Sequence, residues 1–106
     1  MITAIVRFKL PATTTLDEAK SLFEGSAPKY RDLPGLVRKY YLFDRASQTG
    51  GGVYLWESRA AAERVYTAAW KKMIADRYGA MPEILFFDTP VIVDNATGEI
   101  ASDAAE

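Results

Sequence analysis

The first residues of the chain alternate between apolar and polar positions. Ala4, Val6 and Phe8 share one side of an extended chain, whereas the other side carries one aliphatic residue and two cations. A period of two is the side-chain period of a β-strand. The pattern therefore predicts a strand over Ile2–Leu10, which Pro11 ends.

A helical period replaces this alternation in the next segment. Apolar residues recur three and four positions apart within Leu16–Arg31, as on the buried face of a helix. Thr15 and Glu18 have the spacing of a capping box at its start. We expect one helix over this range, with its last turns weakened by Gly25 and Pro28.

Two further strands are predicted in the middle of the chain. Leu36–Asp44 contains four consecutive aromatic or aliphatic residues, and Val53–Trp56 is similarly apolar. The polar segment Arg45–Gly50 between them has the composition of a hairpin loop. Gly51 and Gly52 indicate either a bulge or a close backbone approach where the third strand begins.

The second helical region follows that strand directly. Ser58 is a good N-cap, and the alanines and arginines after it favour helix. Thr67 is an alternative N-cap, so the pattern allows one long helix or two short ones. Gly79 is the expected C-terminal residue in either case.

The C-terminal part is predicted to contain a final strand and a tail. Glu83–Asp94 is apolar and extended, but Pro90 interrupts it, which indicates a bent strand or a strand pair. Ala96–Glu106 is small, polar and acidic, so we expect a flexible or arm-like tail. The folded domain is accordingly expected to span residues 1–95.

The order of elements, β-α-β-β-α-β, predicts an α+β ferredoxin-like fold. In that fold a four-stranded antiparallel sheet carries both helices on one face. The other face is then open, and we expect aromatic residues on it. They are either Tyr41 with Phe43 or Tyr54 with Trp56, and Phe86 or Phe87 adds to either pair. A large apolar surface is unfavourable in water. We therefore predict a homodimer that packs through the open sheet face.

Composition narrows the possible functions. The 106 residues suit one domain, and a net charge of -1 gives no electrostatic reason to expect a nucleic acid or membrane partner. The chain contains no histidine and no cysteine, which removes the usual ligands of zinc, copper and haem iron. It also removes the commonest general base and thiolate chemistry. With no targeting segment recognised at the start, a cytoplasmic protein is the simplest expectation.

Four aromatic residues are candidates for binding a small molecule. Tyr54 and Trp56 lie on the third strand, and Tyr66 and Trp70 are spaced four apart on the second helical region. Together they can line an apolar pocket that stacks an aromatic ligand. The alternative is that they pack the core or a subunit interface, since aromatic residues dominate both.

Arg38 and Tyr40 are the candidates for catalysis. They share one face of the second strand, and a guanidinium beside a phenol can stabilise a developing enolate or phenolate. The alternative role of Arg38 is that of an edge-strand cation that discourages sheet aggregation.

Several segments carry a resemblance to a known family. The sequence resembles the dimeric α/β-barrel monooxygenases of the antibiotic-biosynthesis type, and is most similar to their YdhR-like branch. The segments that carry it, besides the aromatic run after Lys39, are Leu33–Leu36, Gly51–Leu55, Trp56–Ala61 and Phe87–Val91.

This resemblance implies oxidation by O₂ without a metal, flavin or haem, with the electrons supplied by a substrate carbanion. Haem-degrading relatives use a pocket histidine, which this chain lacks. We therefore expect a cofactor-independent monooxygenase of a small hydroxylated aromatic or polyketide-like substrate. The alternatives are a non-catalytic dimer that binds an apolar metabolite or haem-like ring, and a dimer whose aromatic residues only pack.

Overall fold

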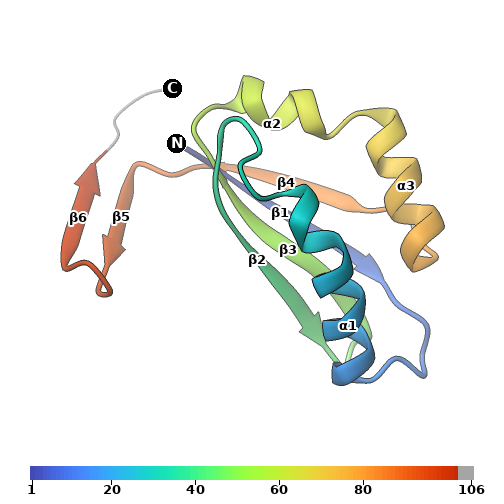
Figure 1. The fold of residues 1–106 in the computed structure, drawn as a ribbon. Coiled ribbons are helices and arrows are strands. Elements are labelled where there is room, and N and C mark those ends of the chain that lie inside the picture. Colours follow the sequence, from blue (N-terminus) through green and yellow to red (C-terminus); the bar gives the residue numbers. More distant parts are fainter. Residues whose placement is uncertain (103–106) are drawn as a thin grey trace.

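A four-stranded antiparallel sheet in the order β2-β3-β1-β4 forms the centre of the molecule (Figure 1). The computed structural model describes residues 1–102. The strands are β1 (Ile2–Lys9), β2 (Leu36–Asp44), β3 (Thr49–Trp56) and β4 (Glu83–Asp88). β1 pairs with β3 and β4, which leaves β2 and β4 as edges. The predicted ferredoxin-like sheet is confirmed.

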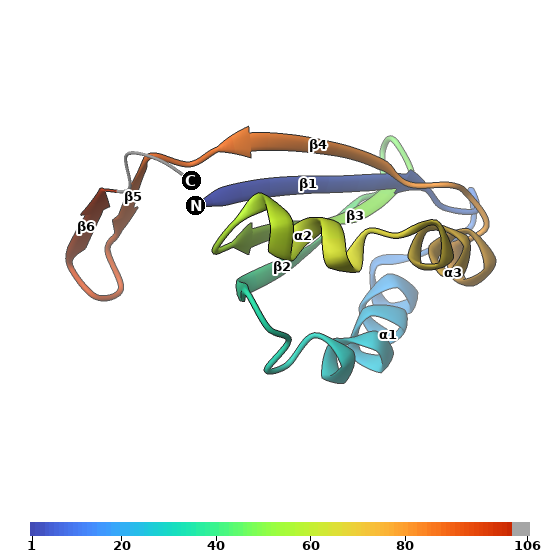
Figure 2. The same ribbon diagram turned by 90° about the horizontal axis from the view of Figure 1, so that it is seen from above.

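All helices cover one face of this sheet, and the other face is open (Figure 2). They are α1 (Leu16–Ser26), the 3-10 helix η1 (Ala27–Lys29), α2 (Arg59–Val65) and α3 (Ala68–Tyr78). The capping box of Thr15 and Glu18 forms as predicted. The α-helix ends at Ser26 instead of Arg31, because Pro28 cannot donate the backbone hydrogen bond that would continue it.

The second helical region consists of two helices. Ser58 caps α2 and Thr67 caps α3, each by accepting a hydrogen bond from the backbone N–H three residues on, at 3.1 and 3.2 Å. Tyr66 lies at the break between them, with non-helical dihedral angles. Gly79 ends α3 at a φ of 92°, in the left-handed region where glycine carries no steric penalty.

The hydrophobic core lies between the sheet and the helices. Trp56 and Val6 are its largest fully buried side chains. At Gly51 a Cβ atom would lie 1.9 Å from the backbone oxygen of Val6, which confirms the predicted close approach. The register irregularity falls elsewhere, between Leu36 and Arg38 on β2.

Strand alternation sorts the side chains of β2 onto opposite faces. Tyr41 and Phe43 pack against the core under the helices, together with Tyr54 and Trp56 of β3. The open face instead carries partly exposed aliphatic residues and two aromatic ones, Tyr40 and Phe87. Phe87 was one of the aromatic residues expected on the open face, whereas both alternative pairs of β2 and β3 lie under the helices.

A C-terminal hairpin projects away from the sheet (Figures 1 and 2). It consists of β5 (Val91–Asp94) paired antiparallel with β6 (Glu99–Ser102), and it follows the predicted break at Pro90. Part of the expected flexible or arm-like tail, Glu99–Ser102, thus forms β6 of this projecting hairpin. Backbone pairing with β5 orders that segment, which composition alone does not reveal. Residues 103–106 of the expected tail lie outside the described residues.

Candidate functional site

The four aromatic residues proposed for binding lie in contact beneath the helices. Tyr54 and Trp56 are stacked with ring centroids 6.0 Å apart, and the ring of Tyr66 meets them edge-on at 5.4 and 5.6 Å. Trp70 of α3 lies 4.8 Å from Tyr66. We call these four side chains the aromatic cluster. The sheet and two different helices therefore bring the predicted residues together.

Hydrogen bonds between indole and phenol groups fix the side chains in the layer between the sheet and the helices. Trp56 Nε1 donates to the Tyr66 hydroxyl at 3.0 Å, and Trp70 Nε1 donates to the hydroxyl of Tyr30 at 3.1 Å. The first of these is the only hydrogen bond of the Tyr66 hydroxyl among residues 1–102, so its own proton has no acceptor there. Burial raises the pKa of Tyr66, which keeps this hydroxyl protonated.

Lys39 extends into the same layer, although the sequence did not single it out. Its Nζ lies 3.5 Å from the ring centroid of Tyr30, 3.9 Å from that of Tyr41 and 4.5 Å from that of Tyr54. We call these three rings the tyrosine cage. Gly52 makes room for the lysine, because a Cβ atom there would lie 3.2 Å from Lys39 Cε.

The environment of the Lys39 amine favours its neutral form. Among residues 1–102 no carboxylate pairs with it, and its Nζ makes no hydrogen bond. Burial lowers the pKa of Lys39 to about 7, because the charged form loses its hydration. The ring faces of the cage attract the ammonium and work in the opposite direction. Lys39 can therefore exchange a proton near neutral pH.

The alternation of side chains along β2 is the sequence feature that could have identified Lys39. The residue lies two and four positions before Tyr41 and Phe43, so all three share one face of β2. Had the aromatic run been assigned to the buried face, a lysine on that face would have been the unusual feature.

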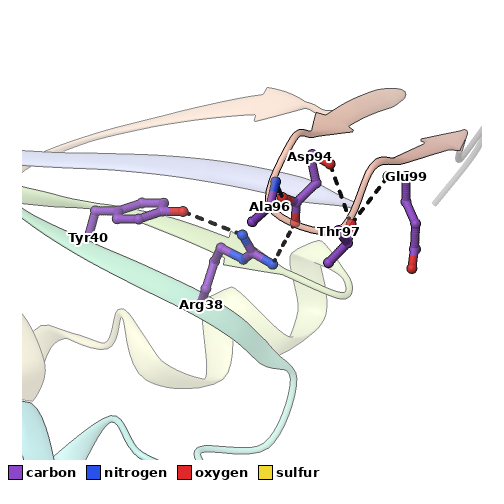
Figure 3. Close-up of polar contacts among 6 residues, drawn as sticks. All are labelled: Arg38, Tyr40, Asp94, Ala96, Thr97 and Glu99. Atoms are coloured by element: carbon purple, nitrogen blue, oxygen red, sulfur yellow. Dashed lines mark hydrogen bonds and ion pairs between the residues drawn. The ribbon is translucent and has the colours of Figure 1, made fainter.

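Arg38 and Tyr40 lie on the open face of the sheet, opposite to Lys39 and Tyr41 of the same strand. Figure 3 shows their contacts with each other and with the hairpin. Arg38 Nη1 donates to the Tyr40 hydroxyl at 3.4 Å, and Nη2 lies 3.6 Å from Asp94 Oδ2. Asp94 also accepts a hydrogen bond from the backbone N–H of Ala96 in the hairpin turn, at 2.9 Å. This arrangement joins the edge strand to the hairpin.

The predicted catalytic pair and the predicted binding residues are thus separated by the sheet within one chain. The physical reason is the period of two: Arg38 and Tyr40 must face away from their neighbours Lys39 and Tyr41. Arg38 and Tyr40 cannot polarise an oxygen of a substrate held by the aromatic cluster of the same chain.

The cavity beneath the helices is small, whereas the hollow over the open sheet face is large. Next to Lys39 the cavity between sheet and helices measures about 10 Å³, which is room for one water molecule. A much larger hollow of about 840 Å³ lies over the open face near the β2–β3 turn. Its rim includes Arg7 and Glu83, which form an exposed ion pair. Another hollow, of about 720 Å³, lies beside α1 and β2, where Tyr41 and Phe43 line it. The aromatic cluster lines neither large hollow, so an aromatic substrate can reach it only if side chains move.

Residues 1–102 contain no group of three or more Asp or Glu side chains placed to hold a metal ion. No helix in that part is long and apolar enough to cross a membrane.

Comparison with known proteins gives a family and a fold. Residues 5–84 match the sequence model of the family described as "Putative mono-oxygenase ydhR". A search of curated protein sequences gives no significant match.

Among solved structures, a mutant of SnoaB, a cofactor-independent oxygenase from Streptomyces nogalater, has a TM-score of 0.60 and 20% identity, covering 83% of this chain and 91% of that one. A monooxygenase from ActVA-Orf6 of Streptomyces coelicolor, solved with Nanaomycin D, has a TM-score of 0.63 and 18% identity, covering 83% and 86%. At these identities the likeness shows a shared fold.

Proposed function

The chain belongs to the ydhR mono-oxygenase family, and on that premise we propose that it is a cofactor-independent monooxygenase of a small hydroxylated aromatic or polyketide-like substrate. We place the reaction in the layer between the sheet and the helices, with the aromatic cluster as the binding surface. The names of two proteins of the same fold support this assignment, since one is called a cofactor-independent oxygenase and the other was solved with Nanaomycin D. A cytoplasmic location stays a prediction.

The observation that carries the proposal is the hydroxyl of Tyr66. Its oxygen accepts the Trp56 N–H, and its own proton has no acceptor among residues 1–102. A hydroxyl that accepts one hydrogen bond donates a stronger one. In an apolar layer such a donor stabilises negative charge that develops on a substrate oxygen. Tyr66 can therefore hold the phenolate or enolate form of a bound substrate.

The electrons for this chemistry come from the substrate. Loss of a proton gives a carbanion that is delocalised onto the substrate oxygen, and this anion reduces O₂. For an anthrone the balance is a CH₂ group plus O₂ giving a C=O group plus H₂O. The protein contributes a dry site, aromatic surfaces for stacking and a hydrogen-bond donor.

Substrate entry requires displacement of Tyr30. This ring forms one wall of the tyrosine cage, and its hydroxyl accepts a hydrogen bond from Trp70 Nε1. It comes from the short segment between η1 and β2. In that segment Asp32 has a φ of 59°, in the left-handed region that is unfavourable for a residue other than glycine. Its backbone hydrogen bonds are mostly those of turns, such as Tyr30 N–H to the oxygen of Ala27 and Leu33 N–H to the oxygen of Tyr30. We therefore expect it to open at lower cost than the paired strands.

A matched pair of hydroxyl deletions tests the location of the site. Oxygen uptake is measured with a panel of anthrones and hydroxyquinones, in the presence of a metal chelator and after subtraction of uncatalysed oxidation. Tyr66→Phe should reduce kcat by about 10²-fold, the usual effect of losing one oxyanion donor. Tyr40→Phe removes the same atom from the open face and should leave kcat unchanged. The opposite result would place the reaction on the open face.

The same panel separates catalysis from passive binding. Trp56 and Trp70 both lie in the proposed site, so an aromatic ligand should quench tryptophan fluorescence. Quenching without oxygen consumption would favour the non-catalytic binding protein and would refute the monooxygenase.

We also propose that the protein is a homodimer in which a second copy covers the open sheet face. Tyr40, Leu42 and Phe87 are each 42–56% exposed on that face. The hairpin beside it exposes Val91, Val93 and Ile100 by 55–73%. Burying these surfaces against a second copy would remove them from water.

Light scattering after size-exclusion chromatography measures the assembly state directly. Leu42→Glu on the open face should give a monomer, because dimerisation would bury its charge. Leu22→Glu on α1, where the leucine is 37% exposed, is the matched control and should remain a dimer. A wild-type monomer at micromolar concentration would refute the dimer.

A further inference from the structure

We propose that Lys39 is the general base of the reaction, removing a proton from the substrate with its neutral amine inside the tyrosine cage. The inference rests on the proposed monooxygenase function and names the group that starts the chemistry. The chain lacks histidine, and its predicted catalytic pair lies on the other sheet face.

The position of the amine is the first support. Lys39 shares Tyr54 with the aromatic cluster, because this ring lies 4.5 Å from Nζ and 5.4 Å from the ring of Tyr66. A substrate that replaces Tyr30 would therefore lie between the Lys39 amine and the Tyr66 hydroxyl. One group would accept the proton and the other would donate to the oxygen that becomes negative.

The cage stabilises the product of the proton transfer. Before the reaction, burial without a carboxylate partner favours the uncharged amine. In the reaction the substrate O–H or C–H bond breaks, its electron pair stays on the substrate, and the proton forms an N–H bond on Lys39. The resulting ammonium faces the two rings that remain, Tyr41 and Tyr54, and a new substrate anion, and both stabilise the cation.

The other titratable groups around the amine include no carboxylate. The small cavity beside Lys39 is also lined by Lys29 of η1 and Arg77 of α3. Arg77 Nη2 donates to the backbone oxygen of Leu22 at 2.6 Å, which fixes its position. The remaining titratable groups there are tyrosine hydroxyls, and burial raises the pKa values of Tyr41 and Tyr54. None of the groups that line this cavity therefore supplies a negative charge to hold the ammonium form.

A series of anthrones of graded acidity tests the base directly. Lys39→Met keeps the apolar stem and removes the amine. On a weakly acidic anthrone we expect kcat to fall by at least about 10²-fold. The deficit should shrink as the substrate becomes more acidic, and nearly vanish for an anthrone that is already ionised at the assay pH. Lys39→Arg stays protonated and should not restore the rate.

The pH profile provides a second readout. Wild-type kcat/KM on the weak acid should rise with pH and level off above the Lys39 pKa of about 7. This rise should be absent in Lys39→Met. Lys20→Met on the exposed side of α1 is the control and should keep the wild-type rate and profile.

The outcomes separate the two proposals. If the wild type consumes oxygen and Lys39→Met shows the same rate and pH profile, the base is wrong and the monooxygenase stands. A loss of the same size across the whole acidity series would also overturn the base, because it would indicate a structural role. If the wild type oxidises none of the anthrones or hydroxyquinones, both proposals fail.

Discussion

Replacing Lys39 by methionine should stabilise the protein at neutral pH. In the folded chain the pKa of Lys39 is lowered from 10.5 to about 7, because burial removes water from the ammonium. Between these two values the unfolded chain binds more protons than the folded one. Wild-type stability therefore rises with pH across this window, and below it the full cost of the buried charge is present.

The size of the change in the free energy of unfolding follows from the lowered pKa of Lys39. Each pH unit inside the window changes the free energy of unfolding by about 1.4 kcal/mol. From about pH 7 to about pH 9.5 the wild type should gain about 3 kcal/mol relative to Lys39→Met, which has no proton to lose. At pH 7 the variant should be more stable by up to about 4 kcal/mol. The lost contact between the ammonium and the ring faces reduces this gain by about 1 kcal/mol.

Urea denaturation monitored by far-UV circular dichroism measures the difference. Both proteins and the control Lys20→Met are unfolded at intervals of half a pH unit across the window. The control should follow the wild type, because Lys20 is exposed. Parallel curves for the wild type and Lys39→Met would refute the reasoning, since they would mean that folding leaves the proton affinity of Lys39 unchanged.

Three further changes test the fold. Thr15→Ala should destabilise the protein by about 1 kcal/mol in chemical denaturation, because α1 loses its N-terminal cap. Gly51→Ala should cost about 3 kcal/mol or more, because its Cβ would meet the backbone oxygen of Val6, which cannot move aside; a smaller loss would contradict the close approach. Arg38→Ala should speed amide hydrogen exchange in residues 91–102 without changing exchange in β1, because it removes the contact with Asp94. Unchanged exchange in the hairpin would show that this ion pair does not hold it.

Three consecutive residues of β2 show that the sequence predicts the strand but not the sheet face that each side chain occupies. The sequence predicts one strand that contains Arg38, Lys39 and Tyr40, and this strand is present. The face that each would occupy depended on which parity of β2 the helices cover. Both parities contain aromatic residues, so hydrophobicity did not decide between them. The sequence favours Arg38 and Tyr40 as catalytic residues, but it is Lys39 that lies beside the aromatic cluster.

Capping and turn residues were more informative, because their effects are local. Thr15, Ser58 and Thr67 each cap a helix at the position where the sequence allowed one. Pro90 marks the end of β4 and the start of the hairpin. The pairing that orders β6 was not predicted, because it depends on contacts between strands and not on the composition of either.

The sequence by itself determined the order of elements, the ferredoxin-like sheet and a set of aromatic residues on β3 and the following helices. Periodicity, helix caps and turns depend on residues that are close together in the chain, so they can be recognised in the sequence alone. Only the tertiary structure decided that Lys39 lies in a tyrosine cage while Arg38 joins the hairpin. Burial and electrostatic environment arise from segments distant in sequence, and they turn an ordinary lysine into a group that can exchange a proton near neutral pH.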